Sequence, residues 1–345
     1  MATLKHIAQS LNLSVMAVSK ALRDAPDIGA ATKERVRKEA KRLGYVPNHL
    51  ARSLRGGSSQ LLGVLFPTIN DSYASNILSG IEQEAAARGY HVLVSSSHHN
   101  PALEMDSVVK MLERQVEALF VLPLVRLQHR SPLLDLAAQH KLPLIFLHHY
   151  PADAAQYENV GWVIDDALKG SEMVTRHLIE AGHKELLYFS GPPTASASSD
   201  HMTGHNRALK AARLPLRTEA FFLAGVDIDG GKQAMVRALA EKVPFTGIVC
   251  VNDAVAMGAI HILKQHGYKV PQDVSVVGYG DGVMAAHAFV PLTTVRQPQV
   301  DLGRAAFNLW FQSKKGEEKL RTKILPVELI VRESSAAVEK INAPS

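Results

Sequence analysis

Three side chains near the start of the chain have the types and the spacing needed to read DNA bases. Val15, Met16 and Lys20 lie in the run Ser14 to Leu22, which has the apolar spacing of a short helix. A lysine can donate hydrogen bonds to guanine O6 or N7, whereas valine and methionine can only contact thymine methyl groups or fill space. Alternatively, Val15 and Met16 only pad the surface of this segment. Three hydroxyl residues are suited to helix capping or phosphate contact: Thr3, Ser14 and Ser19.

A helix-turn-helix head must position these side chains. The first helix has one apolar stripe at helical period, and Asn12 to Ser14 supply the turn. The second helix turns Val18, Ala21 and Leu22 inward, which leaves its N-terminal side free for base edges. A third helix turns Val36, Ala40 and Leu43 inward, and Gly44 follows where a left-handed C-cap belongs. The first stripe consists of Leu4, Ile7, Ala8 and Leu11.

The charge distribution agrees with contact to phosphates. Residues 1–60 hold five Lys and six Arg against two Asp and two Glu, a net charge of +7. The whole chain carries +5, so residues 61–345 carry −2. A basic helix can be merely a solvated surface. Together with the helix-turn-helix spacing, however, the local positive charge favours DNA binding.

A short segment after the head is expected to fold only on DNA. It is too short to form a stable helix by itself, because isolated helices below roughly 12 residues are marginal in water. Its residues with expected DNA roles are Asn48, Ala51, Arg52, Leu54 and Arg55. A linker with an incidental leucine is the alternative. The run Gly56 to Ser59 has the composition of a flexible linker.

The remaining sequence predicts two lobes that each contain a parallel sheet. Short apolar runs alternate with amphipathic stretches, first over residues 61–147 and again over 185–278, as in βαβ folds. Such lobes place a ligand crevice at the carboxyl ends of their strands. Hydrophobic residues make up 46% of the chain, with no stretch long enough for a membrane span. The single cysteine, Cys250, excludes an internal disulfide and fits the cytoplasm; its apolar surroundings predict a buried structural thiol.

Four motifs in register resemble the LacI/GalR family of transcription regulators. They are Thr3 to Ala8, Leu13 to Leu22, Leu43 to Asn48 and Ala51 to Arg55, and together they are far more specific than any one of them. The similarity continues through Gly182-His183, Gly278-Tyr279, Pro291 to Val295 and Val331 to Ser334, and so covers nearly the whole chain.

The resemblance implies an N-terminal all-α helix-turn-helix head with a hinge helix, then a C-terminal α/β bilobed, periplasmic-binding-protein-like sensor. We expect a head over residues 1–47, a hinge and linker over 48–59, an effector-binding and dimerisation domain over 60–335 and a tail over 336–345. In this family the leucine that matches Leu54 enters the minor groove at the operator centre and bends the duplex. The resemblance also implies a homodimer on a palindromic operator.

Strand-end residues that match the family's effector contacts form a second candidate site. They are Asp71, Tyr73, Ser95, His148, His201, Asn252, Asp281 and Gln297. His201 stands where relatives carry an arginine, His148 where they usually carry an aspartate, and Gly280 where they carry a carboxylate. These departures weaken the usual bidentate grip on hydroxyls or a carboxylate. A neutral, carbohydrate-like effector is therefore expected, or else an anion that binds only when a histidine is protonated. Such polar groups can also serve only the loop backbone.

The sequence favours a non-enzymatic regulator, and a repressor in particular. It has no phosphate-cradling loop, nucleophile elbow, dinucleotide fingerprint or metal-hydrolase motif, and no cofactor is expected. The 16 histidines lack metal-ligand spacing, so no metal site is expected either. A solute-binding or carbohydrate-processing α/β protein without an operator remains the alternative. The expected partners are double-stranded DNA, a small molecule and a second copy of the chain, with no membrane.

Overall fold

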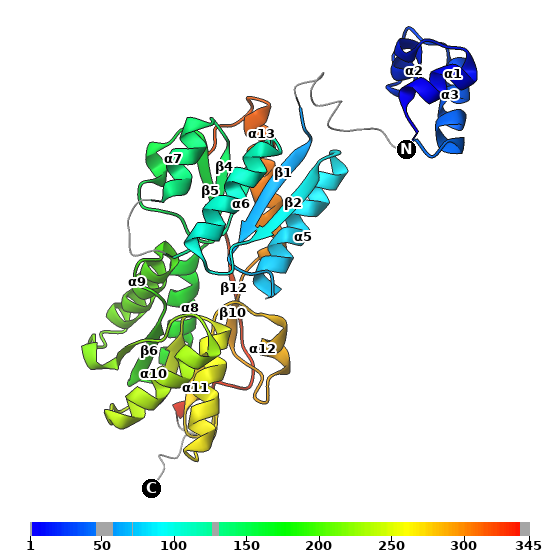
Figure 1. The fold of residues 1–345 in the computed structure, drawn as a ribbon. Coiled ribbons are helices and arrows are strands. Elements are labelled where there is room, and N and C mark those ends of the chain that lie inside the picture. The colour runs from blue at the N-terminus through cyan, green and yellow to red at the C-terminus, as the bar shows by residue number, and fades with distance from the viewer. Residues whose placement is uncertain (1, 46–57, 71, 126–130, 339–345) are drawn as a thin grey trace. The chain divides into compact units, whose positions relative to one another are not determined.

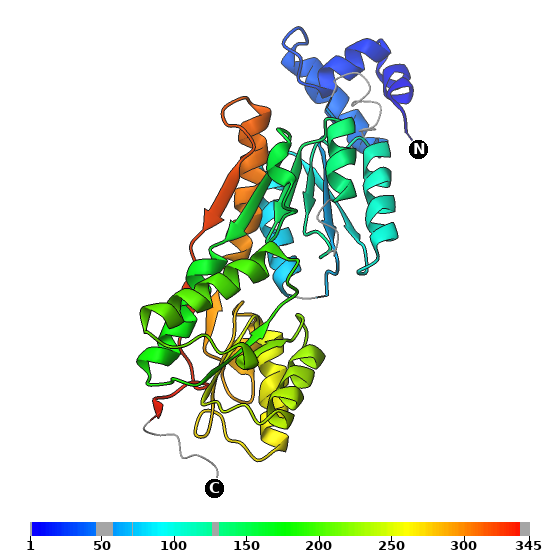
Figure 2. The same cartoon turned by 90° about the vertical axis from the view of Figure 1, so that its left-hand side faces the viewer.

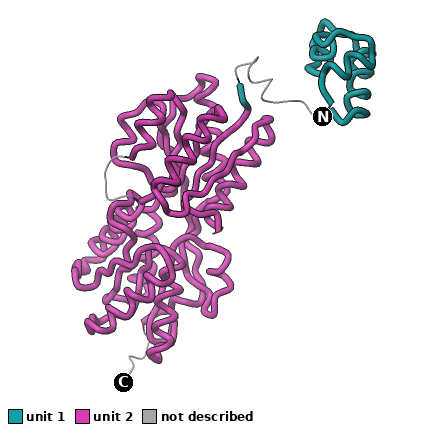
Figure 3. The backbone as a smooth tube through the Cα atoms, viewed as in Figure 1, with its two compact units in different colours: residues 1–59 teal, residues 60–345 magenta. Residues whose placement is uncertain are grey.

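The computed structural model describes residues 2–45, 58–70, 72–125 and 131–338. The chain divides into two compact units, residues 1–59 and residues 60–345 (Figure 3). In the part that the structure describes, no helix is both long and apolar enough to cross a membrane. Within the same residues, no group of three or more His, Cys, Asp or Glu side chains is placed to hold a metal ion.

The first unit is a bundle of three helices around a small apolar core. They are α1 (Leu4–Leu11), α2 (Val15–Leu22) and α3 (Ala30–Arg42). Thr3 caps α1 and Ser14 caps α2, and Gly44 has the left-handed backbone (φ 62°) expected of it after α3. The sequence prediction of these helices, caps and turn is confirmed. The core residues are Ile7, Ala8, Val18, Ala21, Val36 and Ala40.

The N-terminal lobe of the second unit is a six-stranded parallel sheet with helices on both faces (Figures 1 and 2). Its strand order is β11-β5-β4-β3-β1-β2. The strands are β1 (Leu61–Phe66), β2 (His91–Ser96), β3 (Leu119–Val121), β4 (Leu144–Leu147), β5 (Val160–Asp165) and β11 (Thr322–Leu325). One face is covered by α5 (Ser72–Ala87) and α13 (Gln299–Lys314). The other is covered by α6 (Pro101–Glu113) and α7 (Pro132–Gln139), and the short helix η1 (Ala154–Gln156) precedes β5.

The C-terminal lobe repeats this arrangement around a four-stranded parallel sheet of order β7-β6-β8-β9. The strands are β6 (Leu186–Ser190), β7 (Phe221–Leu223), β8 (Gly247–Cys250) and β9 (Ser275–Val277). The helices α8 (Ala167–Glu180) and α9 (Ser196–Ala211) pack on one face, and α10 (Ile228–Ala240) and α11 (Asp253–Gln265) on the other. Shorter elements are η2 (Thr218–Ala220) and α12 (Val283–His287). Cys250 is buried in this core, as predicted.

The chain passes between the two lobes three times. It leaves the N-terminal lobe after β5, returns between β10 (Thr294–Arg296) and α13, and leaves again between β11 and β12 (Glu328–Ile330). The strands β10 and β12 pair antiparallel and lie between the lobes (Figure 1). As a result, the carboxyl ends of β4 and β5 face the C-terminal lobe and position the side chains described below.

Two glycines allow the helices α5 and α13 to pack in close contact. A β-carbon at Gly80 of α5 would lie 2.0 Å from the Val300 carbonyl oxygen of α13, and one at Gly303 of α13 would lie 2.0 Å from the Ile77 oxygen. Real β-carbons do not approach a backbone oxygen this closely. The contact between α5 and α13 therefore requires glycine on both helices.

Candidate functional site

The N-terminal half of α2 presents an open surface on the first unit. Met16 is 70% exposed and Val15 is 45% exposed, while Val18 and Ala21 on the opposite side are buried. The Ser14 hydroxyl accepts a hydrogen bond from the Ala17 N–H (3.0 Å), which fixes the start of the helix. This is the geometry in which the leading turn of a helix can reach base edges in a major groove.

The cations of the first unit divide into paired and unpaired groups. The Lys20 ammonium pairs with the Asp27 carboxylate, and Asp24 binds both Lys33 and Arg37. Among the described residues, Arg35, Lys38 and Lys41 are exposed and make no ion pair. Ion pairs on the surface contribute little to stability, so Lys20 can exchange Asp27 for a base at little cost. Of the predicted DNA contacts, Asn48, Ala51, Arg52, Leu54 and Arg55 lie outside the described residues.

The second unit gathers polar side chains around one buried carboxylate where the lobes meet. Asp165, at the end of β5, accepts hydrogen bonds from the Tyr279 hydroxyl (2.6 Å) and from the Gln297 amide (2.9 Å). The Nδ1 atom of His148 lies 3.4 Å from the same carboxylate. Since a carboxylate only accepts, this nitrogen must be the one that carries the proton.

Two aromatic contacts complete this group. The ring of Tyr73 lies edge-on to His148 with centroids 5.0 Å apart, and His201 lies edge-on to Tyr279 with centroids 4.3 Å apart. His201 is 4% exposed and Gln297 is 8% exposed. We call these six residues the junction cluster: Tyr73, His148, Asp165, His201, Tyr279 and Gln297.

Burial and hydrogen bonding together set the charges of the junction cluster. Burial works to raise the pKa of Asp165, but the His148 and Tyr279 hydrogen bonds and the nearby imidazoles outweigh it and hold that pKa at about 2. Burial lowers the pKa of His201 to about 4, although the Asp165 charge opposes this shift. At neutral pH the cluster thus contains a fixed anion and a neutral His201 imidazole.

Comparison with known protein families covers both units. Residues 3–48 match the family described as bacterial regulatory proteins, lacI family, and residues 175–335 match the periplasmic binding protein-like domain. A relative in Erwinia tasmaniensis, named HTH-type transcriptional repressor PurR, is 30% identical, with 97% of each chain covered. The chain belongs to the LacI family.

Solved structures of LacI-family proteins share the fold. The lac repressor dimer bound to operator and the anti-inducer ONPF has a TM-score of 0.85, with 25% identity and coverage of 97% of this chain and 99% of that chain. The transcriptional regulator CelR in complex with cellobiose has a TM-score of 0.74, 25% identity and coverage of 97% and 100%. The predicted fold class and the assignment to a non-enzymatic family of regulators are confirmed.

This LacI-family chain brings only some of the predicted effector residues together. Tyr73, His148, His201 and Gln297 lie in the junction cluster, and Asp71 lies outside the described residues. The hydroxyl of Ser95 exchanges a hydrogen bond with Ser107 (2.8 Å).

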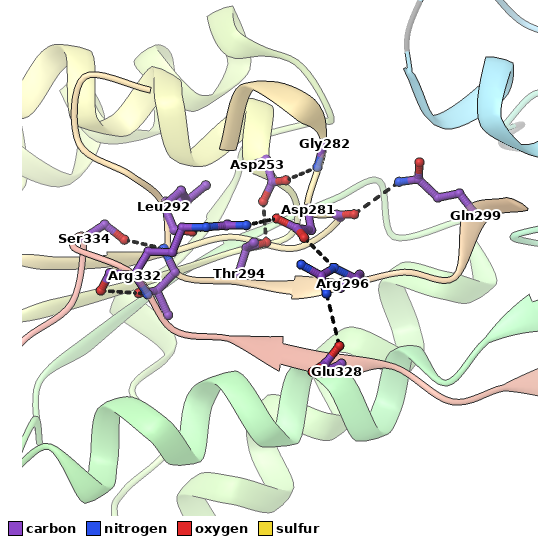
Figure 4. A network of polar contacts seen from close by, with 12 residues as sticks. Asp253, Asp281, Gly282, Leu292, Thr294, Arg296, Gln299, Glu328, Arg332 and Ser334 are labelled. Atoms are coloured by element: carbon purple, nitrogen blue, oxygen red, sulfur yellow. Dashed lines mark hydrogen bonds and ion pairs between the residues drawn. The ribbon is translucent and has the colours of Figure 1, made fainter. Parts of the chain in front are cut away.

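Two further predicted residues are engaged in local structure. Asn252 caps α11 by accepting from the Val255 N–H (2.8 Å), and its amide donates to the Val226 carbonyl (2.8 Å). The Asp281 carboxylate binds Arg332 (2.6 Å) and Arg296 (2.7 Å), as Figure 4 shows. Both side chains thus already hold local structure together in this conformation.

Sequence reasoning missed Asp165, the centre of the junction cluster. A usable signal was present, because the run Val160 to Ile164 is apolar and ends in Asp165-Asp166, as a parallel strand with a polar carboxyl end does. Tyr279 was noted only as part of a family motif. The structure assigns it the shortest hydrogen bond to Asp165.

Proposed function

We propose that this LacI-family protein is a homodimeric repressor that binds an imperfect palindromic operator and responds to a small neutral effector held between its lobes. The exposed leading turn of α2 and the exposed, unpaired cations of α3 support the DNA-binding part. A single head of this size offers too little interface for tight specific binding, whereas two related heads read two half-sites. The role of the hinge residues 48–55 in DNA binding is inferred from the sequence alone.

Exposed apolar side chains on the second unit support self-association. Val283 and Met284 of α12 are exposed by 67% and 62%, and Phe289 just after α12 by 84%. Large apolar side chains so close together are costly in a monomer and are common at homodimer interfaces. One of the similar solved structures is a lac repressor dimer bound to its operator.

The hydrogen-bonding pattern of the junction cluster supports a hydroxyl-rich effector. Asp165 uses the Nδ1–H of His148 and the amide N–H of Gln297, which leaves the acceptors His148 Nε2 and Gln297 Oε1 without a partner among the described residues. No lysine or arginine belongs to this cluster. An effector that donates hydrogen bonds and carries no charge fits these groups, and CelR is a relative solved with the carbohydrate cellobiose.

Replacing Lys20 with alanine tests the proposed base contact. We expect the variant to lose preference at one base pair of each half-site, because a lysine that donates to a guanine edge discriminates between bases by about 1–3 kcal/mol. Selection of binding sites from a random DNA library, followed by salt titrations on operator variants, measures this preference. The exposed and unpaired Lys38→Ala provides a control for phosphate contact. Equal weakening of Lys20→Ala on every sequence, with a shallower salt slope, would contradict base reading.

A thermal-shift panel tests the effector class. Neutral sugars should raise the melting temperature at both pH 6 and pH 8, because they carry no charge at either value and the His201 imidazole, with a pKa of about 4, stays uncharged. Sugar phosphates, nucleosides and organic acids serve as competing classes. A carboxylate that stabilises equally at both pH values, and still does so in His201→Ala, would rule out the neutral-effector proposal.

A further inference from the structure

A groove on the outer side of α9 has no role in the function proposed above. It has a volume of about 590 Å³, which lies within the usual range of roughly 300–1,000 Å³ for small-molecule sites. One wall is a stripe of the helix surface, and the other is the chain that turns back after the helix. Its lining residues are Thr203, Asn206, Arg207, Lys210, Arg213, Leu214, Pro215 and Leu216.

The sequence explains why this wall exists. Thr203, Asn206, Arg207 and Lys210 recur at helical spacing on one side of α9, while Gly204 on another side packs against the Leu168 carbonyl of α8. Arg213 adopts a left-handed backbone (φ 58°), which ends the helix and returns the chain along it. The Leu214 N–H then donates to the Leu209 carbonyl (2.9 Å) and fixes the turn.

The groove concentrates positive charge that the protein itself does not neutralise. Arg207, Lys210 and Arg213 are exposed, and none of them forms an ion pair within the described part of the chain. Several other cations of the same lobe are paired: Arg176 with Glu172 and Glu180, Lys232 with Asp229, and Arg217 with Glu219. Three exposed cations without an ion pair therefore line one groove, in a unit whose residues 61–345 are net negative.

The helix wall of the groove also includes a residue with a polar atom that lacks a hydrogen-bond partner. The Oδ1 atom of Asn206 is buried and receives no hydrogen bond within the described residues. Leaving such an atom unsatisfied costs about 1–3 kcal/mol, so a ligand that supplies a donor would gain from it. Leu214 and Pro215 add an apolar surface on which a ring can lie.

We propose that the α9 groove binds a diphosphate ester that carries hydroxyl groups, such as a nucleoside diphosphate. Arg207 and Lys210 are one turn apart on the helix, and Arg213 lines the same groove from the turn that follows, so the three cations together bind two adjacent phosphates. A ribose hydroxyl donates to Asn206 Oδ1. The site is separate from the junction cluster, although His201 of that cluster lies on the same helix.

Calorimetric titration of the full chain tests this site with two probes, inorganic pyrophosphate and ADP. Both should bind saturably at 150 mM salt, and binding should weaken at least about tenfold in the triple variant Arg207→Gln, Lys210→Gln, Arg213→Gln. The matched control Lys184→Gln, Lys242→Gln, Lys319→Gln removes the same charge from exposed positions elsewhere and should bind as the wild type does. Asn206→Ala should weaken ADP binding but not pyrophosphate binding.

Four results would overturn the proposal. These are unsaturable binding of both probes, an equal loss in the two triple variants, binding of the peptide triglutamate as tight as that of pyrophosphate, or an Asn206→Ala variant that weakens both probes alike. We expect the variants to fold, because all the substituted cations are exposed. Their melting temperatures check this. None of these experiments measures operator binding. The proposal for the α9 groove can therefore be wrong while the repressor proposal remains valid.

Discussion

Asp165→Asn should lower the free energy of unfolding of the second unit by about 3 kcal/mol at pH 7 and abolish the thermal response to the effector. Tyr279, Gln297 and His148 all direct donors at this carboxylate, and an amide offers one acceptor and adds a donor of its own. Loss of a buried, charged acceptor leaves donors without partners, which costs about 1–3 kcal/mol for each group. Urea unfolding measures the change. Asp166→Asn is the neighbouring control, because asparagine also caps the start of α8 well.

The same substitution should change the response to acid. The folded-state pKa of Asp165, about 2, lies below the ordinary aspartate value of about 3.9. Its ionised form therefore stabilises the fold above pH 4, and that contribution is lost as the pH falls through 2. The stability gap between wild type and Asp165→Asn should shrink over this window. A gap that stays constant from pH 4 to pH 2 would show that the charge of Asp165 does not stabilise the fold.

Gly80→Ala should destabilise the second unit by about 3 kcal/mol, even though alanine favours helix formation. The new β-carbon would meet the Val300 oxygen at 2.0 Å and the Arg304 nitrogen at 3.0 Å, so α5 and α13 must move apart. Overpacking of this kind typically costs about 1–3 kcal/mol, and here the obstacle is backbone that cannot rotate away. The propensity gain of about 1 kcal/mol does not offset it.

Denaturant unfolding of Gly80→Ala beside Ser75→Ala tests this contact. Ser75 is an exposed residue of the same helix, so its substitution should change the unfolding free energy by less than about 0.5 kcal/mol. Tyr73 lies in the first turn of α5, and Gln297 lies two residues before α13. Looser packing between the two helices should therefore also weaken the effector response. A Gly80→Ala variant as stable as Ser75→Ala would mean that the two helices adapt without cost.

Local sequence signals were sufficient for the head and for most strands of the two lobes. Apolar periodicity and capping residues act over a few positions, so the helices α1 to α3 and strands such as β1 and β8 were predictable. The helix α9 was not, because its buried side consists of small and polar residues instead of an aliphatic stripe. Those buried residues are Ala197, Ser198, His201, Gly204, His205, Ala208 and Leu209.

The candidate site was less predictable because its contacts join distant parts of the chain. Family matching indicated Tyr73, His148, His201 and Gln297, but the carboxylate that organises them comes from a strand that was not predicted. Asp281 shows the opposite case, because it was predicted to contact the effector but pairs with a distant arginine. Its partner Arg332 lies 51 positions further along the chain, and no local pattern reveals that this aspartate is already paired.

The threefold crossing between lobes fixes the order in which a growing chain can fold. The core of the head uses no residue beyond Tyr45, so the head can fold as soon as it leaves the ribosome. The N-terminal lobe must wait, because α13 supplies Phe307 and Trp310 to its core, and β11 pairs with β5 as the edge of its sheet. The C-terminal lobe receives its last described contact at Val338, whose N–H donates to the Ala181 carbonyl (3.0 Å). Both lobes therefore stay unfinished until translation approaches the end of the described chain, and during that interval their apolar strands are exposed to aggregation.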